Sequence, residues 1–226
     1  AANNIEMDSE VSVNNMVNLN AGGYIQENSG GVIYTDILKT TSTGYQFLSN
    51  NNQIEEFTAI NQGIGDIEFK NQLNDINDIE KLTITGVSQN SGNIDIDNNR
   101  RIEITGPIST VVDGNINLSS IGSQIIRENI SAGGTGNINL EARDPDTNDD
   151  ILKGDLIIHN NINGVTADTG NINLNSGKDV ILNSLVETAG NINITSGRDI
   201  QANAFLEAQN GDSATVNTIT LDAGND

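Results

Sequence analysis

The sequence predicts an all-β protein whose fold is a parallel β-helix, a solenoid in which each turn of the chain, or rung, stacks on the one before. Three observations predict it. A short motif built around glycine and asparagine recurs along the chain. Apolar and polar residues alternate with a period of two, which is typical of strands. No segment has the apolar spacing of a helix.

The recurring motif is a glycine, then Asn or Asp, then two apolar residues separated by one polar residue. Subtraction of successive positions gives intervals of 27, 22, 22, 18, 16 and 20 residues, so the period is about 20 with inserted loops. A diverged copy, TVNTITL, begins at Thr215. The full copies are GDIEF from Gly65, GNIDI from Gly92, GNINL from Gly114, GNINL from Gly136, GDLII from Gly154, GNINL from Gly170 and GNINI from Gly190.

Two further elements complete each rung, so that a rung holds three short strands. Where their copies align, Ile181 matches Gln201, and that position is expected to point outward. The flanking Val180 and Leu182 are expected to point inward. The second element is SGKDVIL (176–182), SGRDIQA (196–202) and NRRIEI (99–104), and the third is SLVETA (184–189) and AFLEAQ (204–209).

Short strands of this kind bury their apolar faces only if the next rung stacks on them at the parallel strand spacing of about 4.8 Å. The glycine of each motif allows a positive φ at a corner. The asparagine after it tolerates a tight turn, and its amide can bond the amide of the next rung. The expected ladder comprises Asn93, Asn115, Asn137, Asn171 and Asn191.

The composition fits one thin aliphatic core. The 226 residues are 35% hydrophobic and 3% aromatic, and the net charge of −21 argues against nucleic-acid binding. There is no cysteine and no apolar run long enough for a transmembrane helix. We expect one β-helical segment over 1–226, with less regular rungs over 1–60 and an acidic loop insertion over 141–155. Both ends read as interrupted rungs, which suggests a fragment of a longer repeat protein.

Catalytic chemistry is not expected. The single histidine, His159, has no cysteine partner and no histidine cluster around it. The alternative is a β-helix that binds or cleaves glycans, which calls for a cleft with clustered carboxylates and an arginine, whereas a flat amide strip favours a structural role. The outward positions expected on the motif strands are Glu68, Asp95, Asn117, Asn139, Asn173 and Asn193. An ice- or mineral-binding face is a minor interpretation, because Thr-x-Thr is sparse.

The stretch DPDTNDDILKGD (144–155) matches much of the calcium-loop pattern. It departs from that pattern because Asp149 replaces the turn glycine and an aspartate replaces the closing glutamate. The sequence therefore leaves two interpretations open: a solvated acidic loop or a Ca²⁺ site. The candidate metal ligands are Asp144, Asp146, Asn148, Asp150 and Asp155.

The repeats resemble the filamentous-haemagglutinin-like repeats of giant bacterial surface proteins. The stretches that carry the resemblance are NQIEEFTAINQGIGDIEFKNQ, LTITGVSQNSGNIDIDN, SAGGTGNINLEARD and TGNINLNSGKDVIL. The resemblance implies a right-handed β-helix at a bacterial cell surface or outside the cell, serving as a stalk, fibre or surface-layer element. Its expected partners are other copies or the rest of a longer chain, with a surface glycan or protein as receptor.

Overall fold

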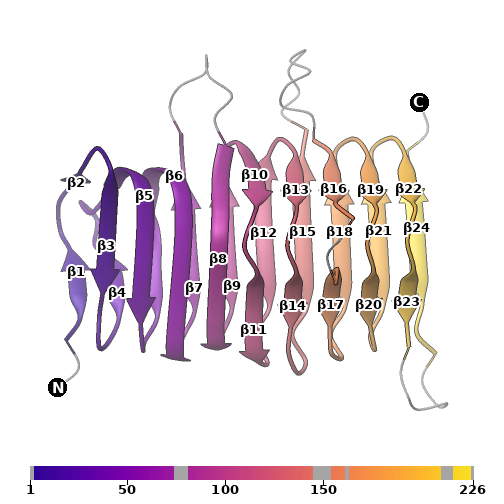
Figure 1. Cartoon of the computed structure of the whole chain (residues 1–226), viewed down its shortest axis with the longest axis horizontal. Helices are drawn as coiled ribbons and strands as arrows, with labels where there is room; N and C mark the ends of the chain where they lie inside the picture. Colours follow the sequence, from indigo (N-terminus) through magenta and orange to yellow (C-terminus); the bar gives the residue numbers. More distant parts are fainter. Residues whose placement is uncertain (1–2, 74–80, 145–153, 161–162, 210–215, 225–226) are drawn as a thin grey trace.

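The computed structural model describes residues 3–73, 81–144, 154–160, 163–209 and 216–224. Within these ranges every regular element is a strand, and every strand pairing is parallel. Successive rungs lie side by side along the long axis, and the two termini lie at opposite ends (Figure 1). The predicted parallel β-helix is confirmed.

The strands form three columns, each running the length of the solenoid. The first column comprises β1 (Ile5–Met7), β4 (Ile25–Glu27), the start of β6 (Gln46–Ile64), β7 (Ile67–Asn71), β9 (Ile94–Asn98), β12 (Ile116–Ile121), β15 (Ile138–Arg143), β18 (Ile172–Ser176), β21 (Ile192–Ser196) and β24 (Ile219–Ala223).

The second and third columns share three long strands, β5 (Ile33–Ser42), β6 and β8 (Lys81–Ser91), which run through the corner between them. The second column adds β2 (Val11–Ser12), β10 (Arg101–Ile104), β13 (Gln124–Ile126), β16 (Leu156–Ile158), β19 (Val180–Leu182) and β22 (Ile200–Ala202). The third adds β3 (Met16–Asn20), β11 (Ile108–Val112), β14 (Ile130–Ala132), β17 (Val165–Ala167), β20 (Val186–Thr188) and β23 (Leu206–Ala208).

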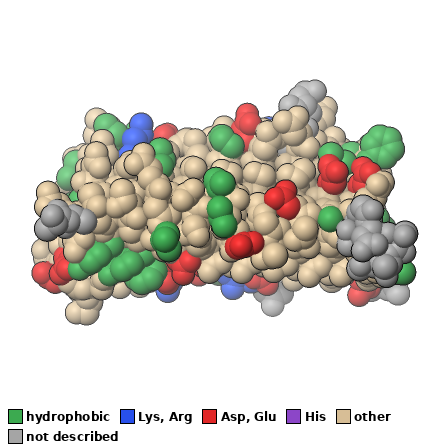
Figure 2. Space-filling model, turned by 90° about the horizontal axis from the view of Figure 1, so that it is seen from below, with side chains coloured by type: hydrophobic (Ala, Val, Ile, Leu, Met, Phe, Trp, Pro, Cys, Tyr) green, Lys and Arg blue, Asp and Glu red, His purple; other side chains and the backbone are tan. Residues whose placement is uncertain are grey.

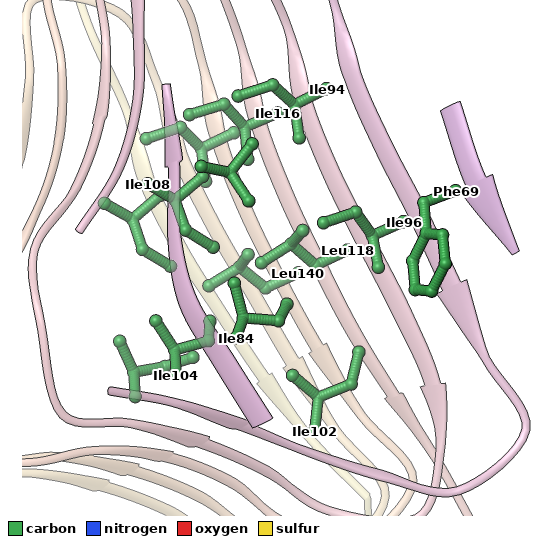
Figure 3. Close-up of a cluster of buried hydrophobic side chains, with 14 of the residues drawn as sticks. Phe69, Ile84, Ile94, Ile96, Ile102, Ile104, Ile108, Ile116, Leu118 and Leu140 are labelled. Carbon is green, nitrogen blue, oxygen red and sulfur yellow. The ribbon is translucent and has the colours of Figure 1, made fainter. Parts of the chain in front are cut away.

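The core consists of identical or similar apolar side chains stacked from rung to rung. Ile116 pairs in register with Ile94 and with Ile138, at steps of 22 residues each. All three are fully buried, and Figure 3 shows Ile94 and Ile116 next to one another inside the solenoid. Burial of each such side chain contributes about 1.5–3 kcal/mol. The same column continues through Ile67, Ile172 and Ile192.

One repeat copy was assigned to the wrong column. The sequence comparison placed GDLII, from Gly154, with the first-column motifs. In the structure Leu156 pairs with Gln124 and with Val180, so this segment is the second element of its rung. An apolar–polar–apolar triplet suits either column, and the motif alone does not distinguish them. The first-column step from Ile138 to Ile172 is therefore 34 residues, by subtraction.

The corner glycines are required mainly by close packing. Gly92 has a positive φ of 130°, as the sequence analysis expected of the motif glycines. At Gly114, Gly136, Gly170 and Gly190 no positive φ is found, but a Cβ would lie well under 3.0 Å from the carbonyl oxygen of the preceding corner glycine. Stacked corners thus leave no room for a side chain at these positions.

A second asparagine ladder lies inside the solenoid and was missed from the sequence. Asn52, Asn71 and Asn98 are at most 1% exposed. The Asn71 side chain accepts a hydrogen bond from Ile54 N at 2.9 Å and donates to Asn98 Oδ1 at 3.0 Å. Similarly, Asn52 Oδ1 accepts from Ile33 N at 2.8 Å. These contacts satisfy backbone groups at the corner between the first and second columns.

Candidate ligand-binding groove on the first column

The outer face of the first column carries two outward rows of side chains that alternate with the buried core positions. The pairing register places Glu68 beside Asp95, as the sequence predicted for these outward positions. The first row is Glu68, Asp95, Asn117, Asn139, Asn173, Asn193 and Thr220. The second row is Lys70, Asp97, Ser119, Glu141, Asn175, Thr195 and Asp222.

The amides of the first row form a continuous ladder. Asn139 Nδ2 donates to Asn117 Oδ1 at 2.6 Å, and Asn173 Nδ2 donates to Asn139 Oδ1 at the same distance. Asn193 extends the ladder to Asn173 at 2.9 Å, and Asn117 donates to the Asp95 carboxylate at the other end. The ladder locks the register of neighbouring rungs and holds each amide in a fixed orientation.

The predicted corner ladder is also present, but most of its bonds run from backbone to side chain. The Asn115 side-chain oxygen accepts from Asn137 N at 2.9 Å, and the Asn137 oxygen accepts from Asn171 N at 2.7 Å. The series continues to Asn191 N at 2.9 Å. At the other end, Asn93 N donates to Asp66 Oδ1 at 2.7 Å. Each corner therefore satisfies a backbone N–H of the next rung.

A groove with a volume of about 460 Å³ lies on this face, over β7, β9, β12 and β15. Such a volume is within the range of ligand-binding clefts. Carboxylates dominate its charged lining. The polar and charged lining residues are Glu68, Lys70, Asp95, Asp97, Asn117, Ser119, Asn139 and Glu141.

Arg143 partly neutralises the second row of the groove. Its guanidinium donates to Asp97 Oδ1 at 3.0 Å and lies 3.9 Å from the Glu141 carboxylate. Ser119 Oγ also donates to Glu141, at 3.2 Å. Glu68 and Asp95, in the first row, lie outside this ion-pair network. The carboxylates of the second row are therefore partly compensated, whereas the acidic end of the groove, at β7 and β9, also holds the first-row pair Glu68 and Asp95.

Aromatic rings border the acidic end. Phe47 pairs in register with Glu68, so the two outward side chains are neighbours on adjacent rungs. The Phe47 ring stacks on Tyr45 with centroids 4.4 Å apart, and Tyr45 stacks on Tyr24 at 4.6 Å. All three rings are half-buried. These rings could not be identified from the repeat motif, because they belong to the less regular first rungs, where only the alternation of inward and outward residues marks them as outward.

His159 lies on a different face, the outer side of the second column. Its Nε2 lies 3.2 Å from Arg127 Nη1, and Arg127 Nε donates to Glu103 Oε1 at 2.5 Å. Burial, and secondarily the Arg127 charge, lower the pKa of His159. Burial acts to raise the pKa of Glu103, but the hydrogen bonds from Lys81 and Arg127 outweigh it and lower that pKa. Lys81, Glu103, Arg127 and His159 thus form a chain of polar contacts on this face.

Most of the proposed calcium ligands, Asp146, Asn148 and Asp150, lie outside the described residues. Asp144 is described and lies 3.9 Å from Lys178 Nζ. Asp155 Oδ1 accepts a hydrogen bond from Asp179 N at 3.2 Å, and so belongs to the corner before β16. Across the described ranges, no group of three or more acidic, histidine or cysteine side chains is arranged to hold a metal ion.

No family model, curated protein or solved structure matches this chain. The class of protein is therefore described from its fold and its outer face alone. It is a parallel β-helix repeat protein, with an amide ladder and a carboxylate-lined groove on the same face.

Proposed function

We propose that this chain is a structural and adhesive rod of a large extracellular bacterial protein, displayed as a stalk, fibre or surface-layer element. One observation carries the proposal: the core column runs in register from Ile5 to Ile219, with each rung hydrogen-bonded to the next. A stack of this kind resists bending and keeps a long, regular surface exposed to solvent.

The charge distribution supports an exposed role. The net charge of −21 keeps a rod soluble and disfavours adsorption to anionic polymers and lipids. Acidic side chains are spread along the face of the rod in Figure 2. The described part of the chain contains no helix that is long and apolar enough to cross a membrane.

Localisation tests the proposal directly. Antibodies raised against the purified chain should label intact, unpermeabilised cells, and small-angle scattering of the chain should give the profile of an elongated rod. Labelling that requires cell lysis would refute the extracellular assignment, and a compact scattering profile would refute the rod.

Self-association along the rod axis is the partner interaction that we propose. Among the described residues β24 pairs with β21, and its core-column residues Ile219 and Leu221 are 43% and 51% exposed in this chain. Exposed parallel edges with apolar side chains are templates for further strand pairing. Sedimentation velocity over a range of concentrations tests this, with Leu221→Lys as the variant expected to stay monomeric and Thr220→Lys, on the outward row, as its matched control.

The groove favours a second, compatible function, the binding of a glycan. A cleft with clustered carboxylates and an arginine is the expected sign of a glycan-binding β-helix, and a flat amide strip is the expected sign of a structural rod. The face has both features: the groove over β7 to β15, and Asn173, Asn193 and Thr195 beyond it. A structural rod that also carries a glycan-binding groove would account for both the groove and the amide strip.

A further inference from the structure

We propose that the groove on the first column binds an oligosaccharide of amino sugars, with a protonated sugar amine held between Glu68 and Asp95. The inference rests on the proposed adhesive function and names the ligand class of its receptor. It is carried by the groove volume, the charge of the lining, the fixed polar groups and the bordering aromatic stack.

The charge of the groove favours cationic ligands and disfavours anionic ones. Its lining carries the four carboxylates of Glu68, Asp95, Asp97 and Glu141 against the single ammonium of Lys70. With Arg143 counted at the rim, the sum is −4 + 2 = −2. The overall charge of −21 adds to the same field. An acidic glycan would therefore be repelled, whereas an amine-bearing one would be attracted.

Glu68 and Asp95 are the pair that a cation would bridge. They are in-register neighbours on β7 and β9, and adjacent parallel strands lie about 4.8 Å apart. Like charges directly opposite one another on a sheet are destabilising. Arg143 compensates Asp97 and Glu141 instead. A protonated amine placed between Glu68 and Asp95 would remove that repulsion and gain charge-assisted hydrogen bonds.

The amide ladder supplies oriented groups for sugar hydroxyls. In the ladder Asn117 and Asn139 each donate one hydrogen bond and accept one, yet a side-chain amide has two N–H donors and two acceptor lone pairs. One N–H and one lone pair per residue therefore remain for a ligand. Because the ladder fixes these amides, little side-chain entropy is lost on binding.

The aromatic stack adds a surface for a sugar ring or its ammonium group. Phe47 is the in-register neighbour of Glu68, at the acidic end of the groove. The face of an aromatic ring attracts a cation that lies within about 6 Å of the ring centroid. Together these features recognise a polyhydroxylated cation, which is the chemistry of an amino-sugar oligomer and not that of a simple amine or a neutral hexose.

Calorimetric titration with a matched ligand pair tests the inference. The probes are the β-1,4-linked tetramer of glucosamine, at a pH below that of its amine titration, and the same tetramer with every amine acetylated. We expect the free-amine tetramer to bind about tenfold more tightly or better, with an affinity that falls as salt is added. Equal affinity for the two tetramers, or no binding of either, would overturn the inference.

The binding affinities of two variants test whether the ligand lies at Glu68 and Asp95. Glu68→Gln/Asp95→Asn keeps the shape of two outward side chains and should reduce affinity about tenfold or more. Glu187→Gln on β20 removes an exposed carboxylate from another face and should leave affinity unchanged. The double variant removes two charges and Glu187→Gln removes one. If Glu187→Gln weakens binding at least half as much on a logarithmic scale as the double variant, the ligand responds only to the net charge, and the proposed site is wrong.

The outcome is separable from that of the proposed function. Scattering and cell-surface labelling report the rod and its location without any ligand. If they support the rod while the tetramer fails to bind, the amino-sugar receptor is refuted and the structural role stands. Phe47→Ala provides a second binding test, with circular dichroism to check that the rung retains its fold, and unchanged affinity would exclude the aromatic contribution.

Discussion

Glu27 is an acidic side chain in the apolar interior, and its replacement by glutamine tests how the core tolerates charge. It pairs with the buried Met7, and its neighbour Gln26 pairs with Phe47, so that Glu27 lies in the core position beside Leu48. It is 8% exposed. Its Oε2 accepts from Asn50 N at 3.0 Å and from Asn52 Nδ2 at 3.3 Å, whereas Oε1 has no partner among the described residues.

The magnitude follows from the pKa. Burial raises the pKa of Glu27 from 4.5 to about 7, because the hydrogen bonds from Asn50 and Asn52 offset only part of the lost solvation. A shift of about 2.5 units corresponds to about 3 kcal/mol of stability. Between these two pKa values the unfolded chain binds fewer protons than the folded one. Stability is therefore fully present below about pH 4.5 and is lost as the pH rises through about 7.

Urea denaturation at about pH 5.5 and about pH 8.5 measures this loss. The wild type should lose more stability between these two pH values than Glu27→Gln, by about 2 kcal/mol. Since repeat proteins can open rung by rung, hydrogen exchange at the Ile25 and Leu48 amides provides the local measurement. The control is Glu187→Gln, which removes an exposed carboxylate. Identical pH dependence in the wild type and Glu27→Gln would refute the reasoning.

Three further perturbations probe the stack. Leu140→Ala, at a core position that is 1% exposed between Leu118 and Leu174, should cost about 3–5 kcal/mol in urea denaturation, and a cost below about 1 kcal/mol would contradict the core packing. Gly170→Ala should strongly destabilise the fold, because the new Cβ would collide with the Gly136 carbonyl oxygen. Thermal unfolding should therefore show a lowered midpoint. Gly22→Ala is the control and should show little change, because a Cβ has space there. Asn137→Ala should cost about 1–3 kcal/mol, because Asn171 N loses its acceptor, whereas Asn137→Asp keeps that acceptor and should recover part of the loss.

The column of each strand could be predicted wherever two copies of the repeat stand close together. Ile172 and Leu174 match Ile192 and Ile194, and the structure pairs them in that register. The prediction failed at Gly154, because the apolar–polar–apolar triplet that follows it suits either the first or the second column. In the rungs that contain β5 and β6 the strands run through the corner between the second and third columns, so no glycine marks that corner.

The candidate site could be predicted only in part. The outward amides and the positions of Glu68 and Asp95 follow from period-two alternation. The groove does not, because side chains on four different rungs, from Glu68 to Glu141, line it together. The aromatic stack was missed for a related reason, since Tyr24, Tyr45 and Phe47 belong to rungs without the regular motif.

The amino-acid sequence alone determined the fold class and the facing of the regular strands, since each inward Ile or Leu must meet a similar residue one rung later if both are to leave water. Only the tertiary structure decided which segments meet across insertions, why the corner glycines are needed and where the acidic groove lies. The physical reason is that these features depend on contacts between rungs, and the number of inserted residues changes which side chains those contacts bring together.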